Sequence, residues 1–380
     1  MSVALFVFGV AFVLYVAFGY PVLLALLARF RTRPVAARPE LKRVSILLPV
    51  HNGASWIEPK LRSILALDYP RELVQVLVIS DGSDDATEEI ARRFASEGIE
   101  LVSLPRGGKM VALNEGIARA TGEILLFTDV RQELDPAGLR SLVACFADPR
   151  VGVASGELLI RQGRTLEEAN VGAYWRYEKW IRKHQSRLDS IMGATGCIFA
   201  MRASLAARMA PDTILDDVVL PLGAFFQGYR LILDEGARAY DSPTSLRSEF
   251  RRKVRTLAGV YQTTGRFPQL LGPGNRIWIH FVSHKLGRLL LPWAMILILG
   301  ASFGLPRWWR AAALTAQAAF YLLVLLDLVV SDASPLKRAT SPARTALVLI
   351  AAAFCAVFYL ALPRQPLWQP TGSSQARTGR

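Results

Sequence analysis

Three apolar segments of this sequence end in polar residues of the kind that bind small polar ligands. Asp81 follows VQVLVIS, Asp129 follows ILLFT, and the segment VSILLPV carries Pro49 and runs into His51 and Asn52. Carboxylates at strand ends can hydrogen-bond ribose hydroxyls, or hold a divalent metal beside a diphosphate. A single strand-end aspartate more often caps a turn or the next helix. Polar residues at the ends of several strands are stronger evidence for a nucleotide-type site.

A second candidate for chemistry is the acidic pair Asp216–Asp217. Transfer of a group to a hydroxyl needs a base that removes the hydroxyl proton as the new bond forms, and a carboxylate beside a like charge suits this role. Adjacent residues on a helix diverge by about 100°, so only one of the two can face a ligand. The alternative is that both carboxylates, which precede Val218, only cap a helix.

The elements that position these residues are short apolar runs, which are typical of strands buried on both faces of a parallel sheet. They alternate with helical segments, which predicts an α/β fold with right-handed crossovers. The polar strand ends then meet at one edge of the sheet. The expected strands are 44–50, 74–80, 99–104 and 124–127.

Composition narrows the class of protein. The mean hydropathy of +0.28 is high for a soluble protein, and the apolar excess gathers at residues 3–28 and beyond residue 285. The net charge of +14 comes from basic residues beside these apolar spans, which favours a membrane surface over nucleic acid. The sequence contains no GxGxxG loop after a strand and no Walker A lysine, and its cysteines and histidines show no metal-type spacing.

Four apolar segments are long enough to cross a bilayer, since about 20 residues span its hydrocarbon core. They are 3–28, 286–305, 311–330 and 345–362. We therefore expect an anchor at 1–30, a catalytic domain at 40–265, an interfacial segment at 266–284, three spans within 285–362 and a polar tail at 363–380.

Basic residues set the expected orientation. Arg29, Arg31 and Arg33 follow the first span, and Lys337 and Arg338 lie between the third and the fourth. By the positive-inside rule, these segments and the catalytic domain face the cytoplasm, with the chain in the plasma (inner) membrane. Asp327, near the cytoplasmic end of the third span, is expected to be hydrated.

The segment 166–188 carries several aromatic residues among many charges. Helical spacing gathers many of the rings on one side. This pattern is compatible with core packing of a long helix, or with an interfacial helix near the route of an acceptor.

Six segments in this order resemble the nucleotide-sugar glycosyltransferases of family 2, which have the GT-A fold, a Rossmann-like nucleotide-sugar-binding domain. They are PVHN, ISDGSDDAT, GGKMVALNEGI, FTDVR, GATGCIFAMR and ILDDVVLP, and the resemblance covers about residues 44–262. The flanking spans resemble those of membrane-bound members such as cellulose, hyaluronan and poly-N-acetylglucosamine synthases.

The resemblance implies a role for each matching residue. Asp217 would be the general base, with Asp216 beside it, and Asp129 would contact the sugar nucleotide and its metal. The residues implied in donor binding are Pro49, His51, Asn52, Asp81 and Lys109. Those implied near the donor sugar, the acceptor or the phosphates are Gly193, Thr195, Gly196, Arg252 and Arg255.

Two departures from the family pattern carry consequences. Arg131 stands where the second aspartate of the DxD motif is expected, so it could replace part of the phosphate neutralisation by the implied Mg²⁺ or Mn²⁺. The segment Arg252–Thr256 stands in place of the QxxRW motif and lacks its Gln and Trp. This loss favours transfer of one or a few sugars over processive synthesis.

The sequence thus predicts an inverting glycosyltransferase that moves a sugar from a nucleotide sugar, foremost a UDP-sugar, to a cell-surface glycan or a lipid-linked acceptor at the bilayer. One alternative is transfer to a polyprenyl phosphate. Another, from a different class, is a transporter with a nucleotide-sensing domain, although the spans show no internal repeat. No nucleic-acid partner is expected.

Overall fold

The computed structural model describes residues 1–160, 166–242, 246–331 and 334–361. Their contacts divide into two compact units. An α/β unit is formed from Thr32–Arg161 and Ser186–Asp241. A helical unit is formed from Met1–Arg31, Gln162–Gln185 and Ser242–Pro363.

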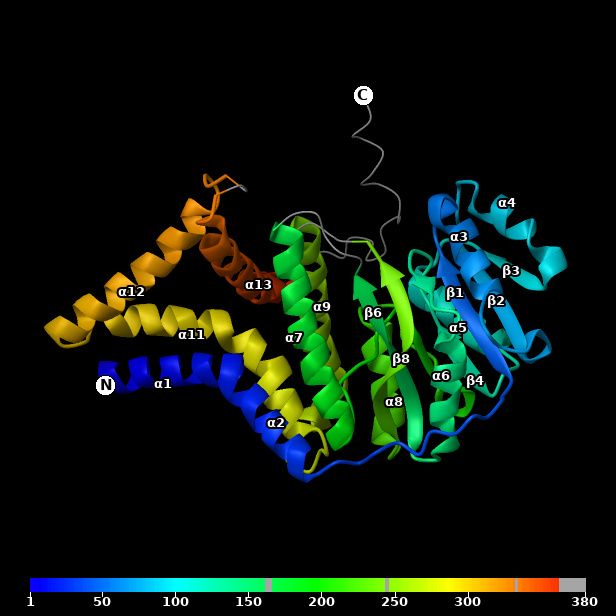
Figure 1. The fold of residues 1–380 in the computed structure, drawn as a ribbon, viewed down its shortest axis with the longest axis horizontal. Coiled ribbons are helices and arrows are strands. Elements are labelled where there is room, and N and C mark those ends of the chain that lie inside the picture. The colour runs from blue at the N-terminus through cyan, green and yellow to red at the C-terminus, as the bar shows by residue number, and fades with distance from the viewer. Residues whose placement is uncertain (161–165, 243–245, 332–333, 362–380) are drawn as a thin grey trace. The chain divides into compact units, whose positions relative to one another are not determined.

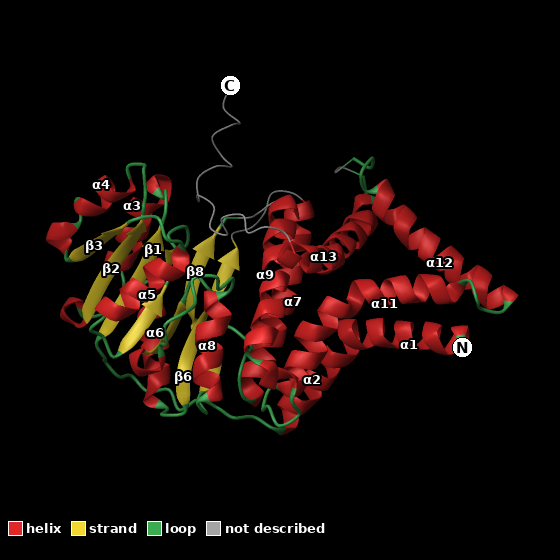
Figure 2. Ribbon diagram, turned by 180° about the vertical axis from the view of Figure 1, so that it is seen from behind, coloured by secondary structure: helices red, strands yellow, loops and turns green. Residues whose placement is uncertain are grey.

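The α/β unit is built on an eight-stranded sheet with the order β3-β2-β1-β4-β7-β6-β8-β5 (Figure 2). Strands β3, β2, β1 and β4 are parallel to one another, and β7 runs antiparallel to both β4 and β6. The strands are β1 Val44–Val50, β2 Val74–Asp81, β3 Ile99–Leu104, β4 Ile124–Phe127, β5 Glu133–Leu134, β6 Val151–Ile160, β7 Phe199–Arg202 and β8 Arg230–Asp241. The four parallel strands confirm the predicted part of the α/β fold, and the mixed half of the sheet was not predicted.

Helices cover both faces of this sheet, which explains why β1 is buried along its whole length. On one face Ile57, Leu61 and Ile64 of α3 join a core with alternate residues of the strands. On the other face Gly116 of α5 allows close approach, since a Cβ there would lie 3.0 Å from Ile79. The longer helices of the unit are α3 Ala54–Leu65, α4 Thr87–Arg92, α5 Lys109–Arg119, α6 Gly138–Ala144 and α8 Asp216–Phe226.

The helical unit contains four helical stretches long and apolar enough to cross a membrane. They are Ser2–Phe30, Trp278–Ser302, Arg307–Leu326 and Lys337–Tyr359. Figure 1 labels the helices α1 Ser2–Leu14, α2 Tyr20–Phe30, α7 Leu166–Leu188, α9 Leu246–Arg266, α11 Gly287–Ser302, α12 Arg307–Leu326 and α13 Lys337–Ala361. Helix α1 runs beside α11, where Gly9 admits the side chain of Ile298. A π-turn at Tyr15–Gly19 joins α1 to α2, and α10 Trp278–His280 leads through another π-turn into α11.

The division of the chain differs from the predicted domain at 40–265. Helices α7 and α9 belong to the helical unit, because their contacts are with other helices of that unit. The Tyr177 hydroxyl donates to the Ala17 carbonyl, Gln185 donates to the Tyr20 hydroxyl, and α9 packs on α13. Long-range contacts of this kind cannot be read from the order of segments along the chain.

The second candidate span begins earlier than predicted, at Trp278 and not at residue 286. Polar residues in this earlier part of the span, which falls within the segment predicted as interfacial, have partners inside the helical unit. His280 hydrogen-bonds the Tyr20 hydroxyl at 3.1 Å, and Ser283 hydrogen-bonds the Tyr15 hydroxyl at 2.7 Å. These side-chain pairs provide partners for polar groups of the candidate span before residue 286.

The prediction that Asp327 is hydrated is wrong, since Asp327 is 2% exposed. Its carboxylate accepts a hydrogen bond from the Thr340 hydroxyl at 2.7 Å and ion-pairs with Arg344 at 3.2 Å and Lys337 at 3.4 Å. The basic segment predicted as a loop therefore forms the first turns of α13. A buried carboxylate needs such partners, because an unpaired charge is costly to desolvate.

Candidate active site

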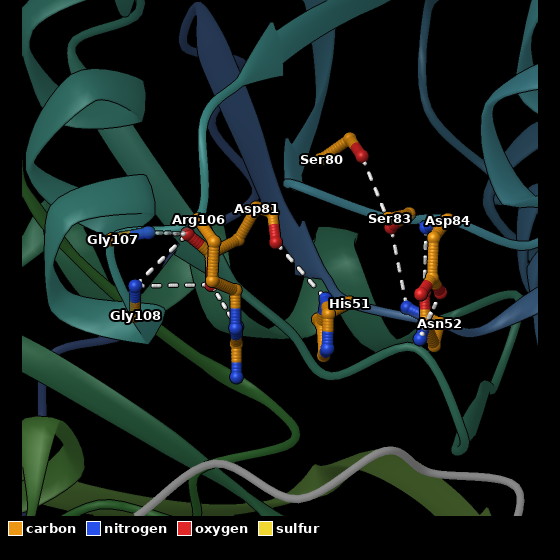
Figure 3. A network of polar contacts seen from close by, with 9 residues as sticks. All are labelled: His51, Asn52, Ser80, Asp81, Ser83, Asp84, Arg106, Gly107 and Gly108. Atoms are coloured by element: carbon orange, nitrogen blue, oxygen red, sulfur yellow. Dashed lines mark hydrogen bonds and ion pairs between the residues drawn. The ribbon is translucent and has the colours of Figure 1, made fainter. Parts of the chain in front are cut away.

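Asp81 is fully buried at the end of β2 and holds the loop that leads into α5 (Figure 3). Its carboxylate accepts hydrogen bonds from the backbone N–H groups of Gly107 at 2.7 Å and Gly108 at 2.9 Å, and it ion-pairs with Arg106. Gly108 has a φ of 93°, a conformation that favours glycine. Asp81 thus supports this loop from within, and Arg106, which the sequence analysis missed, is the exposed member of the pair.

The loops that follow β1 and β2 are tied together (Figure 3). A ring nitrogen of His51 lies 3.0 Å from the backbone oxygen of Asp81. Asn52 adopts a positive φ of 51°. The NH₂ group of its side chain donates to the Asp84 carboxylate at 2.5 Å, and its side-chain oxygen accepts from the Asp84 backbone N–H at 3.0 Å. Pro49 is buried within β1, opposite Ile79. The structure therefore brings His51, Asn52 and Asp81 to one edge of the sheet, as their strand-end positions predict.

Lys109 joins the two acidic positions singled out in the sequence. Its ammonium group lies 3.0 Å from Asp129 after β4 and 3.2 Å from Asp216 at the start of α8. Burial alone would lower the pKa of Lys109, but the charges of Asp129 and Asp216 outweigh it and hold that pKa above its ordinary value. Lys109 is therefore a fixed cation between a buried carboxylate and the partly exposed carboxylate of Asp129.

Asp217 follows Asp216 on α8, and its charge also contributes to the raised pKa of Lys109. Asp216 is buried, whereas Asp217 is half-buried and its carboxylate lies against Gly196. A Cβ at Gly196 would sit 3.2 Å from a carboxylate oxygen of Asp217. The two acids thus have separate environments, one paired with Lys109 and one beside the GATG segment.

The GATG segment is held between β6 and the start of α8. The backbone N–H of Thr195 donates to the Ser155 hydroxyl oxygen at 2.8 Å, and the Thr195 hydroxyl donates to the Gly156 carbonyl at 2.8 Å. The Ala194 N–H donates to the Asp217 carbonyl at 2.7 Å. Gly193 packs against Val218, so a side chain at this position would clash. The predicted residues Gly193, Thr195 and Gly196 therefore lie beside Asp217.

Arg131 has a different setting from the one predicted. Its guanidinium ion-pairs with Asp241 at the end of β8, and Gln132 donates to the same carboxylate at 2.8 Å. Asp241 is 7% exposed, so its charge needs a compensating partner. In this structure the charge of Arg131 is therefore already balanced by a carboxylate, which argues against Arg131 as the main neutraliser of donor phosphates.

The sequence analysis missed Lys60, a residue of α3 that is 1% exposed. Its ammonium group donates to the Thr128 hydroxyl and to the Gln132 carbonyl, each at 2.6 Å. These two bonds hold both ends of the loop that carries Asp129. The sequence did contain a sign that Lys60 is buried. It lies between Ile57 and Ile64 on the apolar stripe of the helix, where a lysine is unusual.

Burial lowers the pKa of Lys60 to about 7, although the nearby charge of Asp129 opposes this. An unfolded lysine titrates near 10.5, so between about pH 7 and pH 10.5 the unfolded chain binds a proton that the folded chain does not. Between about pH 7 and pH 10.5, the free energy of unfolding of the wild type should therefore rise with pH relative to that of Lys60→Met. Thermal unfolding of both proteins in detergent at about pH 6.5 and about pH 9 measures this difference. If the difference in melting temperature between the wild type and Lys60→Met is the same at both pH values, the pKa of Lys60 is not lowered by burial.

Arg252 and Arg255 belong to α9 of the helical unit. Arg252 ion-pairs with Glu249, and its guanidinium lies 4.6 Å from the ring centre of Trp175. Arg255 is exposed. Among the described residues, no group of three His, Cys, Asp or Glu side chains is arranged to hold a metal ion. Asp129 would thus offer a metal ion one carboxylate, and oxygen atoms from the donor or from water would have to complete the site.

A half-parallel, half-mixed sheet with acidic residues at its strand ends is the architecture of a GT-A glycosyltransferase domain. The fold is similar to that of the mannosyltransferase PcManGT from Pyrobaculum calidifontis in complex with GDP-Man and Mn²⁺. The TM-score is 0.70 at 24% identity, over 93% of this chain and 99% of that one.

Residues 45–209 match the family described as Glycosyl transferase family 2, so the chain contains a domain of this family of enzymes. The chain is 24% identical over 270 residues to the poly-beta-1,6-N-acetyl-D-glucosamine synthase of Staphylococcus aureus, and the matched region covers 65% of each protein. It is also 24% identical over 234 residues to the probable glycosyltransferase YdaM of Bacillus subtilis, over 58% of this chain and 56% of YdaM. The chain therefore matches less than two thirds of the length of these relatives.

Proposed function

We propose that this glycosyltransferase is a membrane enzyme that transfers a sugar, with inversion, from a nucleotide sugar to a cell-surface glycan or a lipid-linked acceptor. The observation that carries the proposal is the ion pair of Lys109 with both Asp129 and Asp216, next to the half-buried Asp217. One fixed cation, one partly exposed carboxylate and one separate base are the groups that this chemistry needs. A UDP-sugar is the first donor candidate and a GDP-sugar the second, since PcManGT was crystallised with GDP-Man.

In the proposed reaction Asp217 takes the proton of an acceptor hydroxyl while that oxygen attacks the anomeric carbon of the donor. The bond from the anomeric carbon to the diphosphate oxygen breaks as the new glycosidic bond forms, and the nucleoside diphosphate leaves with the electron pair. Lys109 offsets the negative charge that develops on the leaving group. A divalent metal bound at Asp129 would supply further positive charge at the diphosphate.

The residues present fit a metal held largely by the donor. Mg²⁺ keeps several waters and often uses only one or two protein carboxylates beside phosphate oxygens, and Asp129 offers one. Asp129 is 40% exposed at its side chain and is paired on one side with Lys109, which leaves carboxylate surface for a cation. Mn²⁺ in the PcManGT crystals supports the same expectation for this chain.

Membranes that contain the enzyme should transfer label from one member of a panel of radiolabelled nucleotide sugars into a glycan or lipid fraction. The same assay tests the metal, because excess chelator should abolish transfer and Mg²⁺ or Mn²⁺ should restore it. Membranes without the enzyme are the control. Absence of transfer from every donor in the panel would refute the proposed function, and transfer that persists in chelator would refute the metal alone.

We further propose that the catalytic domain faces the cytoplasm at the plasma membrane, where nucleotide sugars are made. Four candidate spans and the cluster of arginines after Ser2–Phe30 support this orientation. A reporter inserted in the segment 331–343 should then read cytoplasmic, and a reporter fused after Arg380 should read extracytoplasmic. A cytoplasmic signal from the Arg380 fusion would mean that Lys337–Tyr359 does not cross the membrane.

A further inference from the structure

The helical unit holds a second cluster of charged residues, centred on Glu178 of α7. Glu178 is 8% exposed and ion-pairs with Arg288, and His284 lies 3.6 Å from its other carboxylate oxygen. The Tyr174 hydroxyl contacts both Lys253 at 2.7 Å and Arg288 at 3.1 Å. Three helices, α7, α9 and the stretch Trp278–Ser302, therefore meet at one polar cluster.

This cluster has more cations than carboxylates. Lys285 interacts electrostatically with Glu178, Arg288 and Lys253. Glu249 is already paired with Arg252. The described cations are Lys253, Lys285, Arg288 and Arg252, and the described carboxylates are Glu178 and Glu249. Among these described residues, two positive charges are thus left without a carboxylate of their own.

The surroundings make this excess costly without an external anion. Burial lowers the pKa of Lys253 to about 8, with opposition from the charges of Glu178 and Glu249. Lys253 and Lys285 are each only partly exposed, so water compensates their charges incompletely. A phosphate group placed between them would supply the missing negative charge and accept hydrogen bonds from each ammonium.

The cluster also has the composition of a membrane interface. Arg288 is the second residue of α11, where the polar residues of 280–288 give way to the apolar stretch 289–301 of the candidate span Trp278–Ser302. Tyr177 is hydrogen-bonded to Ala17 within the candidate span Ser2–Phe30. The Arg288 guanidinium lies 5.6 Å from the ring centre of Tyr174, and the Lys253 ammonium lies 5.3 Å from that of Trp175. Tyrosine, tryptophan and basic residues at span ends are typical of head-group depth.

We propose that Lys253, Lys285 and Arg288 bind the phosphate of an anionic membrane lipid between the spans. Ammonium and guanidinium groups both donate hydrogen bonds to phosphate oxygens, and basic sites between transmembrane helices bind anionic head groups. The bound phosphate neutralises the excess charge of the cluster. This binding needs no nucleotide sugar and does not depend on the proposed transfer reaction.

The test is native mass spectrometry of the full chain, released from bilayers that contain phosphatidylcholine and phosphatidylglycerol without any nucleotide sugar. The wild type should retain phosphatidylglycerol in preference to phosphatidylcholine. The double variant K253Q/K285Q should bind phosphatidylglycerol about 30-fold more weakly, since two charges near the lipid are removed. K253R/K285R, which keeps both charges, should retain it.

The matched control is R307Q/R310Q, which removes two charges from exposed residues at the start of α12 and should retain the lipid. Equal retention by K253Q/K285Q and the wild type would overturn the proposal, as would equal retention of the two lipids by the wild type. If an equal concentration of inorganic phosphate displaces the lipid, the site binds free phosphate and not specifically the phosphate of a lipid, which would overturn the proposal. If K253Q/K285Q does not fold, Lys285→Gln against Arg307→Gln gives the same comparison.

Discussion

Asp217→Asn should lower the rate of sugar transfer by about 10²- to 10⁴-fold, the usual contribution of a general base. Donor binding should stay near the wild-type level, because the proposed role of Asp217 is toward the acceptor hydroxyl. Asparagine keeps the shape of the side chain beside Gly196 and removes only its ability to take a proton. Turnover with a saturating donor and the donor dissociation constant are the two measurements that separate these effects.

Two further variants show whether the loss is specific to Asp217. Asp68→Asn changes an exposed carboxylate that is paired with Arg140, and it should leave transfer unchanged. Asp216→Asn should do less damage to the chemical step than Asp217→Asn, because Asp216 is buried and already paired with Lys109. If Asp217→Asn transfers sugar as fast as the wild type, Asp217 is not the base.

Lys109→Met should weaken donor binding at least tenfold, since hydrogen bonds to charged groups contribute about 1.5–3 kcal/mol. The same change should lower the melting temperature, because it leaves Asp216 buried without its cation. Lys109→Arg keeps the charge and is the matched control for both measurements. Titration calorimetry with the donor and thermal unfolding in detergent report the two effects separately.

The double variant Lys109→Met/Asp216→Asn distinguishes a donor-binding role of Lys109 from a purely structural one. Removal of the Asp216 charge should recover most of the lost melting temperature, because the buried carboxylate no longer needs a partner. Donor binding should stay weak, since the cation near the diphosphate is still missing. Recovery of donor binding together with stability would show that Lys109 serves only to hold Asp216.

The parallel half of the sheet could be predicted because three of its four strands, β1, β2 and β4, are largely buried and read as apolar runs. The observed bounds of β1, β3 and β4 match the predicted ones, and the structure brings His51 and Asn52 to the edge with Asp81. Such local signals depend on neighbours in sequence. They fix where a strand ends and therefore which polar residues reach the edge.

Contacts between distant segments could not be predicted in the same way. Arg131 and Asp241 are 110 residues apart, and neither residue type nor spacing indicates their ion pair. Lys60 looks like a surface residue by composition, although the structure buries it against the Asp129 loop. The assignment of α7 and α9 to the helical unit likewise depends on packing against helices from both ends of the chain.

The stereochemical course of transfer tests the proposed mechanism most directly. A single base at Asp217 with direct displacement at the anomeric carbon gives a product whose anomeric configuration is opposite to that of the donor. The anomeric proton coupling of the isolated product, measured by NMR against that of an α-linked nucleotide sugar, should therefore show a β linkage. An α linkage in the first product formed would contradict direct displacement driven by Asp217.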